Sequence, residues 1–391
     1  MKKKGFFKND GVQSFIASII CILLGLLIGY IVLLFINPDG ASEAMLRIIQ
    51  NFFKWNRGEK KLESLGNTLV KTAPLLMCSL SILFSYKVGL FNIGVAGQYV
   101  AGACAALIGV FGLHWNWIGC IILAAAAGAA FGAISGLLKA YCNVNEVISG
   151  IMLNWIALYS TNMILNNFVI PGRKDTPELA SSVDTTDAII PNAGLNNLFN
   201  GNKYVGLGIL IAIVFAFAIW ILLSKTKFGY ELKATGYNKN AAKYAGMAEK
   251  RNIVVTLGIG GLIAGIGASL LFLTDFTQWD CNQTSVPAMG FNGIASAFLG
   301  GLNPIGAIFS SFFIQHITDG GANVDLTMYC AQISDLISAI IIYLCSFTGL
   351  IKYLFKAGIF SKKKNQAEEN ANAEPDEKVN AETTEEGGKK Q

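Results

Sequence analysis

The stretch VGLFNIGVAGQYVAG, residues 88–102, places the carboxamide side chains of Asn92 and Gln98 among four glycines and no charged residue. It lies where an apolar run of membrane length begins, so both carboxamides need hydrogen-bond partners inside a helix bundle. On a regular helix the six positions from Asn92 to Gln98 would set the two side chains about 120° apart, so they can share one face only if the glycine-rich start is unwound. Two roles stay open for each carboxamide: a tie between neighbouring helices, or a contact with a polar pathway through the bundle.

The composition around this stretch is that of a polytopic membrane protein. Of 391 residues, 53% are hydrophobic and 14% charged, against roughly 25% charged in soluble domains, and the mean hydropathy is +0.49. The net charge of +5 does not indicate a nucleic-acid partner, because the basic residues gather beside apolar runs, where they report orientation in the membrane. Apolar runs long enough to cross a bilayer as helices predict spans at 14–36, 66–86, 92–112, 117–138, 147–165, 204–224 and 251–274.

A polar interruption, GGLNP at 300–304, divides the next apolar region, 290–316. Glycines allow a tight turn there and Pro304 suits the first turn of a new helix, so we expect two short helices rather than one span. Two passes also leave the basic residues that follow the last apolar run, 329–351, in the cytoplasm. The predicted fold class is therefore an all-α membrane bundle of about ten helices, two of them short and broken at membrane depth, with both termini cytoplasmic.

Charge and composition divide the chain into four parts. Residues 1–13 form a basic cytoplasmic N-terminus, 14–65 a first helix with an external segment, 66–351 the transmembrane domain, and 352–391 a charged cytoplasmic tail that lacks the apolar residues to fold. The first helix has no small-residue cleavage site, so we expect it to stay on the chain rather than to be a cleaved signal peptide. The external residues 37–64 hold five basic residues, against the usual charge rule. External residues 166–203 are expected to form an ordered cap or a docking surface.

The sequence of the largest predicted cytoplasmic loop, 225–250, has a helical pattern that a simple connection between spans would not need. Small and apolar residues recur at helical spacing around Gly236 and Gly246, which predicts short helices. Such helices would present a compact knob to a partner protein. An ordinary basic cytoplasmic loop is the alternative.

Other polar residues in the spans are scattered. Glu146, at the start of a span, suits a helix N-terminus better than an ion site, and Asp335 is a candidate partner for Lys71. The eight cysteines fall mostly singly within apolar runs, as small core residues. One disulfide, Cys281–Cys330, is allowed because both positions are predicted to be external. The two histidines lie far apart without a cysteine pair nearby, so no metal site or cofactor is expected.

Several sequence motifs that would indicate an ATPase or an enzyme are absent. The sequence holds no G-x-x-x-x-G-K-S/T loop, so an active transporter built from this chain needs an ATPase on another polypeptide. It holds no nucleophile elbow and no H-E-x-x-H zinc motif, so an enzyme is not expected. A secondary carrier or channel for a small polar solute, without an ATPase partner, is the alternative, since broken helices also occur in those proteins.

Four segments occur in a recognisable order: GLFNIGVAGQ (89–98), NEVISGIMLNWIA (145–157), GYELKATGYNKNAAKYAGM (229–247) and GFNGIASAFLGGLNPIGA (290–307). They resemble the inner-membrane permeases of ATP-binding-cassette importers for nucleosides and related ribosides or simple sugars, and the likeness runs from about residue 66 to 351. The N-terminal part and LVKTAPLL at 69–76 resemble the larger of the two permeases that such systems encode. The resemblance implies a permease subunit in a bacterial plasma membrane. Its implied partners are an ATPase, a second permease, an extracytoplasmic substrate-binding lipoprotein and the lipid bilayer.

The resemblance also suggests roles for single residues. It implies that 229–247 docks on the ATPase, with Lys233 standing where arginine is common. The coupling residues are then Gly229, Lys233, Gly236, Ala241, Ala242 and Gly246. A nucleoside is uncharged and rich in hydroxyl groups and ring nitrogens, so its pathway needs carboxamides and aromatic faces rather than a cation. The expected lining has that character: Asn92, Gln98, Asn154, Phe291, Asn292 and Asn303.

Overall fold

The computed structural model describes residues 10–55, 57–181, 183–325 and 327–329, together with single positions between 336 and 353. In this part of the chain the fold is all-helical apart from one isolated β-bridge, between Asp175 and Asp280. The longer helices are α1 (Asp10–Ile36), α3 (Gly58–Lys87), α4 (Val95–Phe111), α5 (Trp117–Cys142), α6 (Glu146–Leu165), α9 (Gly208–Lys225), α12 (Glu249–Phe272), α13 (Met289–Leu299) and α14 (Pro304–Gly321). The shorter ones are α2 (Ala41–Gln50), η2 (Asn51–Lys54), η3 (Asn166–Phe168), η4 (Leu179–Ser181), α7 (Val183–Thr186), α8 (Leu195–Leu198), α10 (Lys227–Tyr237) and α11 (Lys239–Tyr244).

The most extensive helix contact in the described part of the bundle is between α5 and α12. Gly128 and Gly132 of α5 face Gly261 and Gly265 of α12, and a β-carbon at any of these positions would collide with a backbone carbonyl oxygen opposite. α4 approaches α12 in the same way, at Gly102. Burying apolar surface does not drive helices together in lipid, so small residues that let backbones approach supply the packing energy instead.

Helix α3 runs through the centre and contacts α9, α12, α13 and α14. Most of α3 is buried, because small residues on the neighbouring helices let those helices pack closely against it. Gly267 of α12 sits where a β-carbon would be 2.8 Å from Met77, and Gly293 of α13 where one would be 2.8 Å from Cys78. The element at the middle of the bundle is therefore held from several sides at once.

The break between α13 and α14 follows the GGLNP sequence. The chain turns at Gly301 and Leu302, which have φ angles of 65° and 54°, and the side chain of Asn303 caps α14 by accepting the amide N–H of Ile305 (3.0 Å). Three buried hydroxyl groups join the two helices: the Ser296 oxygen lies 3.0 Å from that of Ser310 and 2.7 Å from that of Ser311.

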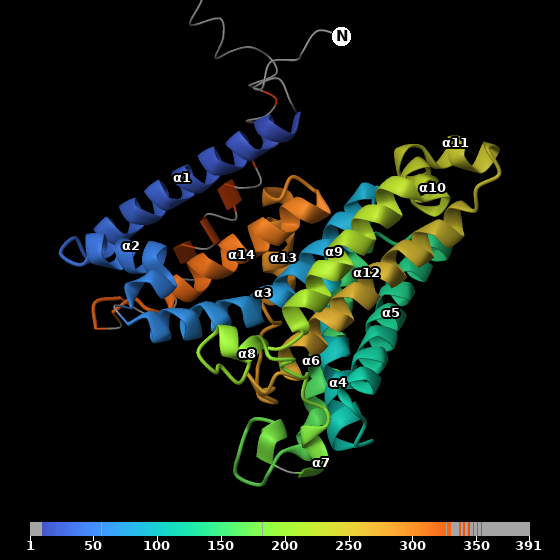
Figure 1. Ribbon diagram of the computed structural model, residues 1–391. Helices are drawn as coiled ribbons and strands as arrows, with labels where there is room; N and C mark the ends of the chain where they lie inside the picture. The colour runs from blue at the N-terminus through green and yellow to red at the C-terminus, as the bar shows by residue number, and fades with distance from the viewer. Residues whose placement is uncertain are drawn as a thin grey trace, which may run out of the picture.

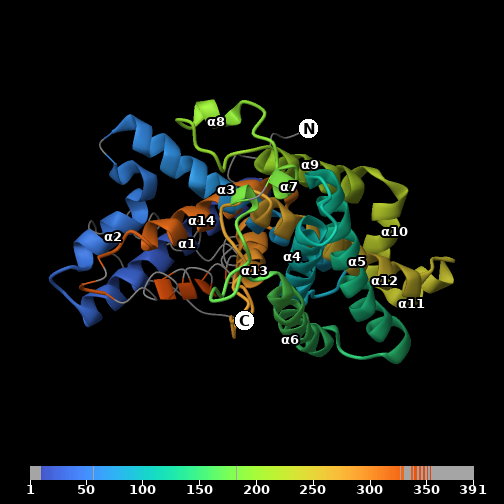
Figure 2. The ribbon, with the colours of Figure 1, turned by 90° about the horizontal axis from the view of Figure 1, so that it is seen from below.

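The bundle has two distinct ends. Figure 1 shows α10 and α11 at one end and α7 and α8 at the other, while Figure 2 shows α1 and α2 on the side away from α5 and α11. At the α7–α8 end, the segment after α6 is joined to the segment after α12. The Asp275 carboxylate accepts the amide N–H of Leu179 (2.9 Å), and the Trp279 indole donates to Asn162 (3.0 Å). These contacts make residues 166–203 an ordered cap.

The predicted helix positions agree with the structure over the described residues. The seven longer predicted spans correspond to α1, α3, α4, α5, α6, α9 and α12, although α3 begins at Gly58 rather than near residue 66. The pair predicted in 290–316 is α13 and α14; α13 is short, whereas α14 has 18 residues and continues to Gly321. Six helices of the described part are long and apolar enough to cross a membrane, and α4 and α13 are shorter apolar helices. The total of about ten stays a prediction, because most of 329–351 and the predicted tail, 352–391, lie outside the described residues, as do 1–9 of the N-terminus.

One expected ion pair is different in the structure. The Lys71 ammonium pairs with Asp319 of α14 (2.8 Å), whose carboxylate also accepts a hydrogen bond from Gln315 (3.0 Å); Asp335 lies outside the described residues. Glu146 is in the first turn of α6 as predicted, but Asn145 is the cap, and Glu146 pairs with Lys139 of α5 (2.7 Å). Both ion pairs tie neighbouring helices together.

The α5–α12 contact gives the first prediction. Gly261→Ala places a methyl group against the Gly128 carbonyl oxygen, whereas at Gly258, one turn away, the β-carbon would lie 3.7 Å from the Ala129 oxygen, an ordinary contact. We expect Gly261→Ala to destabilise the protein by about 1–3 kcal/mol and Gly258→Ala to be neutral. Thermal unfolding midpoints in detergent measure both, and equal midpoints would show that this close approach does not hold the bundle together.

Candidate solute pathway and coupling site

The two carboxamides of the opening stretch bind each other. The Asn92 side-chain amide donates to the Gln98 oxygen (3.0 Å), the Gln98 amide donates to the Asn92 oxygen (3.1 Å), and both side chains are buried. This geometry is available because α4 starts only at Val95, so Asn92 lies on non-helical chain and the 120° offset of a regular helix does not apply. The unwound start that the glycines allow is therefore present, and the reciprocal pair satisfies one donor and one acceptor of each side chain.

Asn154 of α6 completes this arrangement. Its oxygen accepts the amide N–H of Gly97 in the first turn of α4 (2.7 Å), and its side-chain amide donates to the carbonyl of Ile93 (3.1 Å). The first amides of a helix have no partner within the helix, and in an apolar bundle water does not supply one. α6 comes close enough because Gly94 and Gly150 meet at the crossing, where a β-carbon on Gly150 would be 2.8 Å from the Gly94 nitrogen.

Two serines of α3 form the other wall of this polar cluster. The Ser85 hydroxyl donates to the carbonyl of Ser81 (3.1 Å), while the buried Ser81 hydroxyl has no hydrogen-bond partner. Gly260 of α12 covers the cluster, and a β-carbon there would lie 3.0 Å from both the Asn92 side-chain nitrogen and the Ser85 oxygen. Sequence reasoning missed these residues because a serine in an apolar helix gives no signal of its own; the i, i+4 spacing of Ser81 and Ser85 was the only clue.

The other three predicted pathway residues are separate from this cluster. Phe291 is exposed and Asn292 is partly exposed on α13, away from the buried Gly290 and Gly293 that face α4 and α3. Asn303 is exposed at the turn between α13 and α14. The six residues therefore form a buried group of three and an accessible group of three.

The coupling loop folds back onto the end of α3. A β-carbon on Gly236 of α10 would collide with the backbone of Val88, and one on Gly89 would lie 2.9 Å from the Gly236 oxygen. Gly89 has a φ angle of 78°, which a larger residue rarely adopts. Thus α10 rests on the first residues of the same unwound segment that carries Asn92.

The remaining predicted coupling residues hold α10 and α11 in place or face outward. Gly229 is pressed against the carbonyl of Leu222 in α9, and Ala242 is buried. Lys233 is partly exposed, and Ala241 and Gly246 are exposed, Gly246 at a φ angle of 79°. A contact that the sequence did not reveal anchors α10 to α12, where the Asn252 side chain donates to the buried Thr235 hydroxyl (2.9 Å). The outward surface carries three exposed aromatic side chains: Tyr230, Tyr237 and Tyr244.

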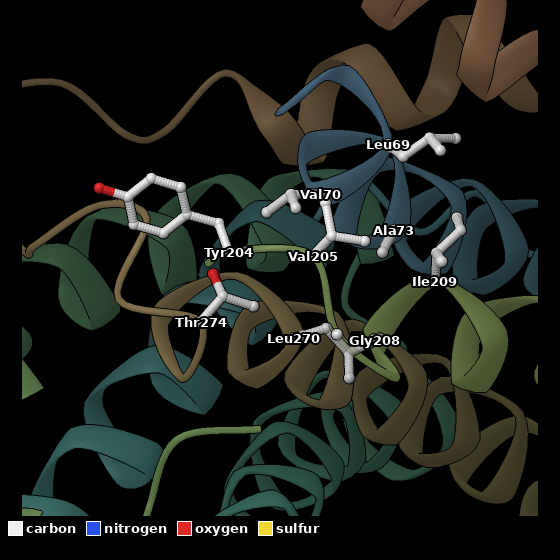
Figure 3. Close-up of a pocket in the computed structure, with 10 residues that line it drawn as sticks. Leu69, Val70, Ala73, Tyr204, Val205, Gly208, Ile209, Leu270 and Thr274 are labelled. Atoms are coloured by element: carbon white, nitrogen blue, oxygen red, sulfur yellow. The ribbon is translucent and has the colours of Figure 1, made fainter. Parts of the chain in front are cut away.

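Two pockets differ in size and character. A pocket of about 360 Å³ lies between the ends of α3 and α9, α10 and the α13–α14 turn; it is lined by Lys87, Trp220, Leu223, Ser224, Lys233, Tyr237 and residues 301–304. Asn303 therefore shares a pocket with two lysines, contrary to the cation-free surroundings expected from sequence. The second pocket, between α3, α9 and α12, is apolar and about 10 Å³, room for one water molecule rather than a solute (Figure 3).

The described residues contain no group of three or more His, Cys, Asp or Glu that could hold a metal ion. Cys281 is a buried free thiol in the cap, and burial raises its pKa to about 11, with the Asp280 and Asp175 carboxylates adding to the effect. Cys330 lies outside the described residues, so the Cys281–Cys330 disulfide stays a prediction.

The sequence matches a family of transport proteins over most of its length. The family described as "Branched-chain amino acid transport system / permease component" matches residues 64–346. The chain is 30% identical to the guanosine ABC transporter permease protein NupP of Bacillus subtilis (strain 168), over 88% of this chain and 96% of that protein. It is also 30% identical to the nucleoside ABC transporter permease protein NupB of Lactococcus lactis subsp. cremoris (strain MG1363), over 92% of this chain and 99% of that protein. A second guanosine permease of Bacillus subtilis, NupQ, is 28% identical over 73% of this chain and 90% of its own length. No solved structure matches the chain.

The reciprocal carboxamide pair gives the second prediction. Asn92→Leu or Gln98→Leu alone leaves the other carboxamide buried without its partner, which costs about 1–3 kcal/mol. The double variant removes both polar groups, so we expect it to be no less stable than the worse single variant. Thermal unfolding of the four proteins in detergent measures the coupling. Additive losses in the double variant would show that the two side chains do not depend on each other.

Proposed function

The chain belongs to the "Branched-chain amino acid transport system / permease component" family, and from this premise we propose that it is the membrane-spanning subunit of an ATP-binding-cassette importer for nucleosides. The observation that carries the substrate class is the match, over nearly the whole length of each, to relatives named as guanosine and nucleoside permeases. Members of this family transport solutes and are not enzymes. Membership also favours an ATP-driven importer over the carrier or channel that the sequence left open.

The helices α10 and α11 are proposed to dock on the ATPase. They lie together at one end of the bundle (Figure 1), and Tyr244 at the end of α11 is 93% exposed. An exposed aromatic ring on a short helix that Ala242 fixes to the rest of the protein is a suitable anchor for a pocket on a partner protein. On this assignment the α10–α11 end, and both chain termini, are cytoplasmic, and the cap formed by 166–203 and 274–288 is external.

Movement of the ATPase would reach the bundle through Gly236. Because Gly236 touches the backbone of Val88 and Gly89 without an intervening side chain, a shift of α10 toward the unwound segment must displace the start of that segment. That segment leads through Asn92 to the first turn of α4, which Asn154 ties to α6. This series of contacts is a physical route for coupling, because each step is a hydrogen bond or a direct backbone contact.

The solute pathway is proposed to follow the accessible group, Phe291, Asn292 and Asn303, with a second permease closing the other side. The buried group, Asn92, Gln98 and Asn154, fixes the helices behind it and becomes accessible only if the unwound segment opens. The pocket beside Asn303 also contains Lys233 of the coupling helix, so the pathway and the ATPase contact meet there. A second permease is supported by the two guanosine permeases, NupP and NupQ, named in one organism.

Uptake measurements test the substrate. The chain, its cognate ATPase, second permease and extracytoplasmic binding protein are produced in cells that lack their own nucleoside uptake, and radiolabelled guanosine, uridine and glucose are supplied. We expect ATP-dependent uptake of the nucleosides, and Asn303→Leu to slow purine and pyrimidine nucleosides alike. Asn303→Ser, which retains the α14 cap, separates capping from solute contact. Uptake of glucose alone would contradict the nucleoside assignment.

Two variants separate ATPase docking from transmission. Gly236→Leu forces α10 away from Val88 but leaves the exposed face of α11 unchanged, so we expect the ATPase to co-purify while uptake falls at least tenfold. Tyr244→Ala removes an exposed ring and is expected to weaken co-purification. Normal uptake by Gly236→Leu, at wild-type levels in the membrane, would contradict the role of this contact.

A further inference from the structure

Residues 37–57 connect α1 to α3 and must lie at one face of the membrane. Both flanking helices are long and apolar enough to cross a bilayer, and α1 ends at Ile36 while α3 begins at Gly58. Figure 1 shows α2 at the end of α1 that is remote from α10 and α11. This segment is unusually basic for an external loop, and the transport function does not explain that charge.

The connection is held firmly against α14. A β-carbon on Gly320 of α14 would collide with the carbonyl of Ile48 in α2, so the two backbones touch. The buried Asn51 side chain donates to the Thr68 hydroxyl (3.3 Å) and lies 3.3 Å from a His316 ring nitrogen. The outward-facing side chains of α2 and η2 therefore have a fixed direction.

Those side chains form an apolar stripe. Leu46, Ile49 and Phe53 are 54%, 44% and 63% exposed. The three-residue spacing of Leu46 and Ile49 puts them on one face of α2, and Phe53 follows in η2, after the chain turns at Asn51. The opposite face, with Ala41, Ala44 and Ile48, is buried in the protein. The outer side of α2 is mixed, because Ser42, Glu43 and Gln50 are exposed beside Leu46 and Ile49. A helix that is covered by protein on one side and carries both apolar and polar side chains on the other matches the geometry of a helix in the membrane interface.

Basic and aromatic residues follow the stripe directly. The Lys54 and Lys60 ammonium groups lie 5.7 and 4.9 Å from the Trp55 ring centre, and Arg57 is exposed between them. The ion pairs found among the described residues, Arg47–Glu43, Lys71–Asp319 and Lys139–Glu146, involve none of these three cations. Tryptophan prefers the headgroup level of a bilayer, and lysine and arginine beside it face the phosphates.

We propose that residues 46–55 and 57–60 form a binding site for the headgroup of an anionic phospholipid. Leu46, Ile49 and Phe53 lie among the upper acyl chains, Trp55 lies at the glycerol level, and Lys54, Arg57 and Lys60 bind the phosphate and its additional negative charge. The site explains why this connection keeps its basic residues, and it depends on neither the transported solute nor the side of the membrane. The apolar stripe favours a lipid over an acidic protein partner, because it continues from the lipid-crossing helix α1, whose last residues Phe35 and Ile36 are also exposed.

Lipid titration of the purified, delipidated full chain in nonionic detergent tests the proposal. Native mass spectrometry measures the binding of phosphatidylglycerol, phosphatidylcholine with the same acyl chains, and glycerol 3-phosphate. The test variant is Arg57→Gln/Lys60→Gln, and the matched control is Arg173→Gln/Lys174→Gln, which removes the same charges from an exposed part of the cap. Each basic residue near a lipid surface strengthens binding roughly fivefold, so we expect the test variant, which lacks two, to bind phosphatidylglycerol about 25-fold more weakly.

The proposal predicts a different lipid affinity for each variant and each ligand. Wild type and the control bind phosphatidylglycerol more tightly than phosphatidylcholine, the test variant loses most of this preference and keeps the part that Lys54 supplies, and glycerol 3-phosphate does not compete because it lacks acyl chains. A further variant, Phe53→Ser, should weaken both lipids. Unchanged phosphatidylglycerol affinity in the test variant, an equal loss in the control, or full competition by glycerol 3-phosphate would overturn the site. Loss of binding to the extracytoplasmic protein with lipid affinity intact would assign the basic cluster to that protein instead.

Discussion

The first amide groups of a helix that begins inside an apolar bundle need hydrogen-bond partners from outside the helix. In α4 one such partner is the side chain of Asn154. Asn154 reaches from α6 to accept the amide of Gly97 and to donate to the carbonyl of Ile93. Because water does not reach these groups, each hydrogen bond replaces an unsatisfied polar group rather than a solvated one. The position of α4, and with it the Asn92–Gln98 pair in front of it, depends on this contact.

Glycines connect the start of α4 to the neighbouring helices, because they allow close backbone contacts. Gly94 and Gly150 bring α4 and α6 together, Gly260 leaves room for the Asn92 and Ser85 side chains, and Gly89 meets Gly236. Backbone contacts of this kind have no flexible side chain to absorb a displacement. A movement of α10 must therefore be transmitted to the segment 88–94 or break the contact, whereas a side-chain contact would allow α10 to slide.

The sequence predicts helix positions well here because the bilayer sets their length and excludes polar interruptions. The GGLNP break and the helical nature of 225–250 are local properties of glycine, proline and spacing, so they too are predictable. The carboxamide partners are not, because the regular-helix geometry that relates Asn92 to Gln98 fails in the unwound segment. The Asp319 partner of Lys71 was also missed in the sequence. Asp319 lies near the end of α14, and its distance from Lys71 depends on how α14 packs against α3, which neither segment's sequence specifies.

The central claim is that α10 holds the unwound segment through Gly236, and hydrogen exchange measures that directly. Amide exchange of the peptide covering 88–98 is followed by mass spectrometry in the wild type, Gly236→Leu and Tyr244→Ala, each as the full chain in detergent. The account predicts faster exchange of this peptide in Gly236→Leu, including the Gly97 amide that Asn154 accepts, and unchanged exchange in Tyr244→Ala. Unchanged exchange of 88–98 in Gly236→Leu would contradict it, because α10 would then not control the start of α4.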